Sequence, residues 1–207
     1  ISIIRLSGKD AISIVNQCFK GKNLEEVPTH TINYGHIYDG EELIDEVLVS
    51  VMKGPRSFTA EDVVEVNSHG GIITTNRILE TMLNHGARLA EPGEFTKRAF
   101  LNGRIDLVKS EAVMDLIESK SDEARKMALS QLGGTTSTLI TNFRNTLKQL
   151  LSSIEVNIDY PEYYDIEVMT VEKIKEQVSI MKKELQELVK SSENTATIKN
   201  GIKTVIL

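Results

Sequence analysis

The sequence is short of the residues that build disulfide-bonded, metal-binding or membrane-spanning structures. Its 207 residues include no tryptophan and a single cysteine, Cys18, which excludes an internal disulfide framework and is typical of a reducing compartment. The apolar runs are far shorter than the roughly 20 residues of a transmembrane helix. The four histidines and Cys18 show no paired ligand spacing, so we expect no metal site. No signal-peptide layout opens the sequence, and a cytoplasmic location is expected.

Positive charge is also scarce. Lys and Arg number 24 against 30 Asp and Glu, which gives a net charge of −6, and residues 1–102 and 103–207 are both acidic, at −4 and −2. Any contact with RNA must therefore be local or carried by a partner. The sequence contains neither a Gly-x4-Gly-Lys-Ser/Thr loop nor a Gly-x-Gly-x2-Gly fingerprint, so we do not expect these residues to bind a nucleotide.

The first half of the sequence alternates between strand and helix signals and predicts an α+β domain. Asp39-Gly40 is a strong turn signal between two apolar runs, which predicts a hairpin of strands 31–38 and 43–52. Ser7 is predicted as the N-cap of a first helix that carries residues 11–19. The remaining elements are expected as strands at 1–6, 62–66 and 87–89 and as helices at 72–83 and 95–101.

The second half is predicted to be helical. Residues 107–160 carry a helical pattern that Gly133-Gly134 interrupts and Pro161 ends. Residues 171–188 place apolar side chains three and four residues apart, a heptad seam that needs another helix to lie against. The chain closes on the β-branched run 202–207, which is typical of a strand. We therefore expect both ends to be cut, and the domains to be residues 1–102, residues 103–201, and the start of a further domain at 202–207.

Three places in the first half could carry chemistry, and each has a plainer explanation. Ser68-His69-Gly70-Gly71 lies at a strand-to-helix junction that could hold an anion, although a tight turn that needs glycine explains it better. Cys18 falls on the apolar stripe of its helix, which indicates an inert buried thiol. Glu65 alternates with Val64 and Val66, so its carboxylate could accept two parallel hydrogen bonds from a flat heterocycle such as a pterin or guanine. From spacing alone, a solvated strand residue is the more common explanation.

The most informative segment is residues 91–107, EPGEFTKRAFLNGRIDL. With further segments it closely resembles the signature of the MnmE (TrmE) family of tRNA-modification GTPases, and the likeness runs over essentially the whole chain. The other matching segments are IIRLSG at 3–8, PRSFTAEDVVE at 55–65, SHGG at 68–71, EAVMDLI at 111–117 and GIKTVI at 201–206.

The resemblance implies both a fold and a function. The family has an N-terminal α+β domain that is similar to the folate-binding domain of aminomethyltransferases and forms homodimers. An all-α helical domain follows, with a Ras-like G domain inserted into it. In a heterotetramer with an MnmG-type flavoprotein, the family adds an aminomethyl or carboxymethylaminomethyl group to carbon 5 of the wobble uridine of certain tRNAs. The one-carbon unit comes from a tetrahydrofolate derivative, 5-formyl or 5,10-methylene, and contact with tRNA is expected to be indirect or transient.

In the matching motifs, the folate contacts of the family fall on Arg5, Glu65 and Arg104. The Glu65 carboxylate would accept the paired donors of the pterin, and the arginines would donate to its carbonyl or to the carboxylates of the glutamate tail. Which arginine does which stays open. The P-loop and the K⁺ and Mg²⁺ sites of the family would follow Leu207, and Cys18 does not correspond to its C-terminal cysteine motif. We therefore expect the chain to bind folate and self-associate, without a catalytic residue, a metal site or GTP hydrolysis of its own.

Two other functions stay open. A free-standing, tetrahydrofolate-dependent aminomethyltransferase-like protein would share the first domain, although the helical second half and the run 202–207 speak against it. A scaffold would use its apolar seams only to pair subunits. Titration with 5-formyltetrahydrofolate, before and after Glu65→Ala, distinguishes these possibilities.

Overall fold

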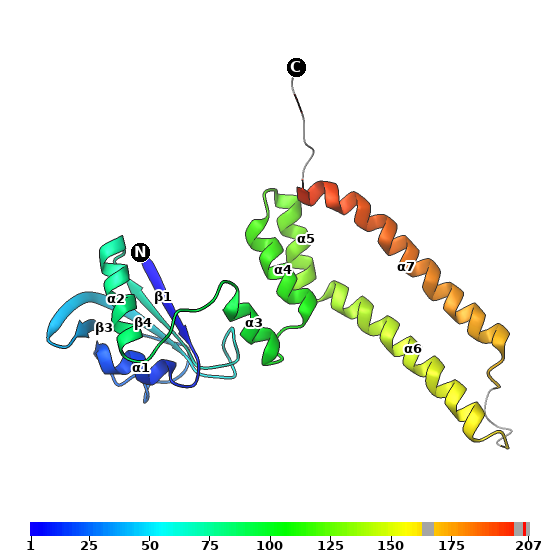
Figure 1. The fold of residues 1–207 in the computed structure, drawn as a ribbon, viewed down its shortest axis with the longest axis horizontal. Helices are drawn as coiled ribbons and strands as arrows, with labels where there is room; N and C mark the ends of the chain where they lie inside the picture. The colour runs from blue at the N-terminus through cyan, green and yellow to red at the C-terminus, as the bar shows by residue number, and fades with distance from the viewer. Residues whose placement is uncertain (163–167, 201–204, 206–207) are drawn as a thin grey trace. The chain divides into compact units, whose positions relative to one another are not determined.

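The chain divides into two compact units (Figure 1). The computed structural model describes residues 1–162, 168–200 and 205; the first unit is Ile1–Asp106 and the second begins at Leu107. Within the described residues the first unit combines strands and helices, whereas the second contains only helices. This confirms the predicted order of an α+β part followed by an all-α part. The strand predicted at 202–207 lies, except for Val205, outside the described residues.

A five-stranded antiparallel sheet forms the frame of the first unit, in the order β1-β5-β4-β3-β2. The predicted hairpin is present as β3 and β4, which pair from Thr31–Val51 to Asp39–Glu42. β1 lies at the edge of this sheet and pairs along its whole length with β5. The strands are β1 (Ser2–Ser7), β2 (Phe19–Lys20), β3 (Thr31–Asp39), β4 (Glu42–Met52) and β5 (Val63–Ser68).

One face of the sheet carries the hydrophobic core. Alternate strand residues such as Leu6, Val49 and Val66 are buried there, as the period of two in a strand requires. Helices α1 (Ala11–Cys18) and α2 (Ile72–Asn84) add Val15 and Ile78, which are completely buried in the same cluster. Both helices therefore cover this face of the sheet.

The start of the first helix differs from the prediction. α1 begins at Ala11, and the residue at its N-cap position, Asp10, makes no side-chain capping bond. Ser7 instead ends β1, and its hydroxyl hydrogen-bonds to Thr59 and Glu61. The predicted N-cap was wrong because these partners are 52 and 54 residues away in the sequence, where a local pattern carries no information about them.

The end of the same helix also differs, because Phe19 joins the sheet. The backbone of Phe19 is extended and pairs with Ile37 in the short strand β2. Its ring lies against Gly21 and Gly35: a Cβ placed on Gly21 would be 2.6 Å from the ring. The missing side chains of these two glycines leave the space that Phe19 fills.

The segment after α2 is not the strand predicted at 87–89, because it has no regular structure. The N–H of Ala87 donates to the carbonyl of Met82 at 3.1 Å, which closes the C-terminus of α2. The predicted helix at 95–101 is present as α3 (Glu94–Leu101). The predicted domain boundary, between residues 102 and 103, lies between α3 and the division of the two units after Asp106.

The second unit contains four helices in the ranges that are described. Gly133-Gly134 interrupts the helical run as predicted, whereas a further break occurs before Ser121, whose hydroxyl caps the next helix by accepting from the N–H of Ala124. In the heptad seam, Met181 is buried and Val178 is exposed. The described helices lack the combination of length and apolar character that a membrane crossing needs. The helices are α4 (Leu107–Glu118), α5 (Asp122–Leu132), α6 (Thr135–Asp159) and α7 (Val171–Asn200).

Candidate functional site

Two of the three predicted ligand-binding residues are neighbours on the sheet. Arg5 on β1 and Glu65 on β5 are cross-strand partners and lie on the face opposite the core, which we call the outer face. The register continues their row across the sheet through Ser50 to Ile32. The adjacent row of the outer face consists of Ile3, Asn67, Leu48 and Tyr34. The charged pair therefore shares the outer face with the polar residues Ser50 and Asn67 and with exposed apolar side chains, namely Ile3, Ile32, Tyr34 and Leu48.

The ion pair leaves part of the carboxylate available. Both Nε and Nη2 of Arg5 contact the same oxygen, Oε1 of Glu65, at 2.7 and 2.6 Å. In the described part of the chain, Oε2 of Glu65 has no hydrogen-bond donor. The two side chains are 44% and 21% exposed. Since an ionised carboxylate offers about four acceptor positions, Glu65 is oriented by Arg5 and can still accept hydrogen bonds from a ligand.

The third predicted residue, Arg104, lies in the loop after α3. Its guanidinium carbon is 5.1 Å from the centroid of the Phe58 ring, and the corresponding distance from Arg5 to Phe95 is 5.8 Å. Cation–π contacts of this kind restrict a guanidinium without using its N–H donors. Among the described residues the Arg104 guanidinium has no carboxylate or carbonyl partner. The structure thus joins Arg5 to Glu65 directly, and it places Arg104 on a separate loop with its donors available.

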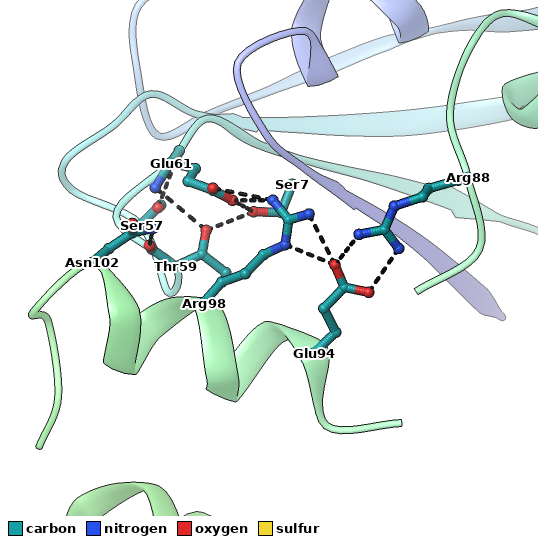
Figure 2. Close-up of polar contacts among 8 residues, drawn as sticks. All are labelled: Ser7, Ser57, Thr59, Glu61, Arg88, Glu94, Arg98 and Asn102. Carbon is teal, nitrogen blue, oxygen red and sulfur yellow. Dashed lines mark hydrogen bonds and ion pairs between the residues drawn. The ribbon is translucent and has the colours of Figure 1, made fainter. Parts of the chain in front are cut away.

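A chain of ion pairs and hydrogen bonds joins α3 to three other segments of the first unit (Figure 2). Glu94, the first residue of α3, accepts hydrogen bonds from Arg88 and Arg98. Nη1 of Arg98 also donates to both oxygens of Glu61, at 3.1 and 3.2 Å. The other Oε2 contact of Glu61 is the hydroxyl of Ser7, at 2.8 Å. We call these residues, with Thr59, the Glu94 network.

The electrostatics of the Glu94 network fix its charge state. Glu94 is only 7% exposed, and the hydrogen bonds from Arg88, from the backbone N–H of Glu91 and from Arg98 hold its pKa well below the usual range of a carboxyl group. Hydrogen bonding to Glu94 also raises the pKa of Arg88 and of Arg98. Glu94, Arg88 and Arg98 therefore stay ionised at physiological pH, which suits an electrostatic frame and excludes Glu94 as a proton donor.

A cleft of about 850 Å³ lies beside the free edge of β1. This volume is within the range of small-molecule pockets, about 300–1,000 Å³. Arg5, Phe95 and Arg98 line the cleft, whereas Glu65 and Arg104 do not. Arg5 consequently belongs to both the cleft and the ion pair of the outer face. The apolar part of the wall includes Ile4, Leu6, Ile14, Leu79, Met82 and Leu89.

The junction at residues 68–71 is closed by a carboxylate of the chain itself. Asp45 Oδ2 accepts from the backbone N–H of His69 at 3.0 Å, and Oδ1 contacts Nδ1 of the same histidine at 2.9 Å. Gly70 and Gly71 have φ values of 92° and 90°, which glycine adopts readily. The tight turn is thus the explanation that the geometry favours over an anion site.

The other candidates have structural roles. Cys18 is buried, its sulfur lies 3.8 Å from the sulfur of Met82, and burial raises the pKa of the thiol to about 11. This confirms the predicted burial of Cys18, and a buried thiol with a raised pKa is expected to be unreactive. Across the part of the chain that the structure describes, no group of three or more His, Cys, Asp and Glu side chains is arranged to hold a metal ion.

Of the members of the Glu94 network, only Ser7 was given a role from sequence, as the N-cap of the first helix, and that role was wrong. A local signal was present for two of them, because Glu94 and Arg98 are four residues apart on a predicted helix and such pairs interact. For Glu61 no such signal exists, since its partner Arg98 is 37 residues away. Tertiary structure therefore brings Glu61 to the Glu94–Arg98 pair.

Comparison with known proteins identifies the class to which this arrangement belongs. A model of the N-terminus of the GTP-binding protein TrmE matches residues 1–104, and a model of the MnmE helical domain matches residues 107–204. The chain therefore belongs to the MnmE (TrmE) family, as the resemblance of its motifs predicted. The two matched segments correspond to the sheet-containing unit and the helical unit of the structure.

Individual relatives agree with the family assignment. The chain is 56% identical over 209 residues to the tRNA modification GTPase MnmE of Ligilactobacillus salivarius (strain UCC118) and 54% identical over 207 residues to that of Streptococcus thermophilus (strain CNRZ 1066). It is 52% identical over 207 residues to the protein of the same name from Lactococcus lactis subsp. cremoris (strain MG1363). The matches cover 100% of this chain and 45–46% of each relative. The chain thus spans a little less than half the length of these relatives.

Proposed function

We propose that the first unit binds a tetrahydrofolate derivative, 5-formyl or 5,10-methylene, through Arg5, Glu65 and Arg104. The observation that carries this proposal is the geometry of Glu65: Arg5 orients its carboxylate by two contacts to Oε1, and Oε2 has no donor among the residues that the structure describes. Since Arg5 occupies both acceptor positions of Oε1, the two acceptor positions of Oε2 are the ones that can accept the adjacent N–H donors of a pterin ring. The guanidinium of Arg104, which has no carboxylate or carbonyl partner among the described residues, supplies donors for a carbonyl or for the glutamate tail.

Calorimetric titration of the chain with 5-formyltetrahydrofolate tests the proposal. Glu65→Ala removes two charge-assisted hydrogen bonds of about 1.5–3 kcal/mol each, so we expect an affinity loss of at least about 100-fold. Glu42→Ala is the matched control, because Glu42 forms a comparable pair with Arg77 at 3.0 Å, elsewhere in the first unit. Unchanged affinity in Glu65→Ala would refute the role of this carboxylate. If the unaltered chain does not bind, the folate proposal fails, and the subunit-pairing scaffold becomes the better explanation.

We further propose that two copies of the chain pair through the outer face. Leu48 and Tyr34 are adjacent on this face and exposed, and Ile3 and Ile32 extend the apolar area on either side of the ion pair. An exposed apolar surface of this kind is typical of an interaction site. Because Glu65 lies in the same face, pairing would enclose the folate site and exclude water from it.

The assembly state of a surface variant tests the pairing. Leu48→Lys places a charge in the centre of the proposed interface and is expected to give monomers in size-exclusion chromatography with light scattering. Ile73→Lys is the control, since Ile73 is 86% exposed on α2, away from the outer face. Dimers of unchanged stability in Leu48→Lys would exclude the outer face as the interface, and a monomeric unaltered chain would exclude pairing altogether.

For the whole protein, we propose the activity that the names of its relatives indicate, a GTPase in tRNA modification. With an MnmG-type flavoprotein it would install an aminomethyl or carboxymethylaminomethyl group at carbon 5 of the wobble uridine, in the cytoplasm. GTP, K⁺ and Mg²⁺ would bind outside residues 1–207, and tRNA contact would be indirect or transient, in keeping with the net charge of −6. Complementation of a strain that lacks the full-length protein, with nucleoside mass spectrometry as the readout, tests this activity; Glu65→Ala should abolish the modification.

A further inference from the structure

We propose that Glu94 and Arg98 are positioning residues for the folate site. They would fix the two ligand-binding arginines relative to each other through α3 and the loop at residues 53–62, while making no contact with the ligand themselves. This inference rests on the proposed folate site. It also assigns a role to the most specific segment of the sequence, residues 91–107, which contributes only Arg104 to the predicted ligand contacts.

The hydrogen bonding of Glu94 is already complete. Oε1 accepts from Arg88 and Arg98, and Oε2 accepts from Arg88 and from the N–H of Glu91 at 2.8 Å. Arg98 is similarly engaged, with Nε and Nη2 on Glu94 and Nη1 on Glu61. Although both side chains line the cleft, a ligand that bound to either would have to displace an existing ion pair. Their geometry therefore suits support of the site better than recognition.

The Glu94 network reaches β1 at Ser7, close to Arg5 on the same strand. Glu61 accepts from the Ser7 hydroxyl at 2.8 Å, and the hydroxyls of Ser7 and Thr59 are 2.6 Å apart. Ser7 is two residues after Arg5 on the same strand, so the two side chains share a face. Thr59 is completely buried. The loop at 53–62 is thus fastened to the strand that carries the first ligand-binding arginine.

The same connections place the aromatic neighbours of both arginines. Phe95 directly follows Glu94 on α3 and lies 5.8 Å from the guanidinium carbon of Arg5. Phe58 directly precedes Thr59 and lies 5.1 Å from that of Arg104. Each guanidinium therefore rests on a ring whose chain neighbour belongs to the Glu94 network.

The backbone of Arg104 is tied to the same frame. Its N–H donates to the carbonyl of Ala99 in α3 at 2.9 Å. Just before it, the side chain of Asn102 donates to the carbonyl of Thr59 at 2.7 Å. Movement of α3 relative to the loop would consequently shift Arg104, Phe58 and Phe95 together. Arg5 and Glu65 are held separately by strand pairing, whereas the Glu94 network and these hydrogen bonds help to set the position of Arg104 relative to them.

The first test measures ligand binding in the full chain. Glu94→Gln removes the carboxylate that joins Arg88 to Arg98. We expect the affinity for 5-formyltetrahydrofolate to fall by about 10-fold to 100-fold in this variant. Arg98→Lys keeps the positive charge but cannot bridge two carboxylates, so an intermediate loss is expected. Glu61→Gln is a milder variant that serves if Glu94→Gln does not fold, and Glu42→Gln is the matched control. All titrations are made at a temperature where circular dichroism shows each variant to be folded.

The second test needs no ligand and separates a positioning role from a general loss of stability. The side-chain Nε–H signals of Arg5 and Arg104 are recorded by ¹⁵N NMR for the unaltered chain and for each variant. Glu94→Gln is expected to shift the signals of both arginines, although neither contacts Glu94, whereas Glu42→Gln should shift neither. Unshifted signals, or an affinity within two-fold of the unaltered chain, would overturn the inference. If the unaltered chain does not bind the folate but the signals shift, the proposed function fails and the positioning of the arginines stands.

Discussion

Truncation of Ile78 is expected to destabilise the first unit strongly, and Cys18 provides a direct way to measure it. Ile78 on α2 is 0% exposed and packs in the same cluster as Cys18. Ile78→Ala removes three buried carbon atoms and leaves a cavity that the sheet can close only in part, which costs about 2–5 kcal/mol. Ile73→Ala on the same helix is the control, because Ile73 is 86% exposed and such a change costs at most about 0.5 kcal/mol.

The assay is the rate at which a thiol reagent modifies Cys18. The chain has one cysteine, it is 3% exposed, and burial raises its pKa to about 11, so modification requires the core to open. At 1.36 kcal/mol for each factor of ten, Ile78→Ala should accelerate modification by about 30-fold to 5,000-fold. Equal rates in Ile78→Ala and Ile73→Ala would refute the reasoning, because Cys18 would then be reached by local fraying of α1 rather than by opening of a common core.

Three further changes have defined outcomes. The Asp45 carboxylate raises the pKa of His69 in the folded chain. The contact therefore stabilises the fold fully below the ordinary histidine pKa of about 6.5, and this stabilisation is lost as the pH rises through the raised pKa of the folded state. In an NMR titration of His69, Asp45→Asn should lower the pH at which the histidine is half protonated. Gly35→Ala would place a Cβ 2.6 Å from the carbonyl oxygen of Lys20 and into the Phe19 ring, and it should cost about 1–3 kcal/mol in urea unfolding. Gly40→Ala would force alanine into the left-handed conformation of this turn, with φ 60°. The free energy of unfolding is expected to fall by about 1 kcal/mol in the same assay.

The elements that local patterns define were the ones that sequence predicted well. The hairpin around Asp39-Gly40 has both its turn chemistry and its alternation within one short stretch, and the structure pairs it as predicted. Gly133-Gly134 and the helix at α3 are likewise local signals. Phe19 shows the limit of prediction from local patterns. Its spacing from Val15 is helical, but its backbone pairs with Ile37 in β2 and its ring fills the space beside Gly21 and Gly35. Contacts across the sheet overrode a valid local preference.

In the candidate site, likewise, individual residues could be predicted from the sequence, but the contacts between distant segments could not. Glu65 was proposed from alternation on a single strand, and the family motifs added Arg5 and Arg104, but no pattern predicted that Arg5 and Glu65 face each other. That pairing follows from the antiparallel register of β1 and β5, which connects residues 60 apart. The Glu94 network was missed for the same reason, since it depends on where α3 and the loop at 53–62 meet.

The two halves of the proposed folate site are held by different kinds of structure, and this difference has consequences for the ligand binding that we expect. Arg5 and Glu65 are on paired strands, where backbone hydrogen bonds on both sides of β5 fix the register. Arg104 is on a loop, where position depends on side-chain ion pairs and a few hydrogen bonds. Arg5 and Glu65 alone could bind a flat head group, because both lie on paired strands. A ligand that also contacts Arg104 requires α3 to be in its position, since α3 holds the backbone of Arg104. Weakening the Glu94 network should therefore reduce the affinity for an intact folate more than the affinity for a ligand small enough to use only the strand pair.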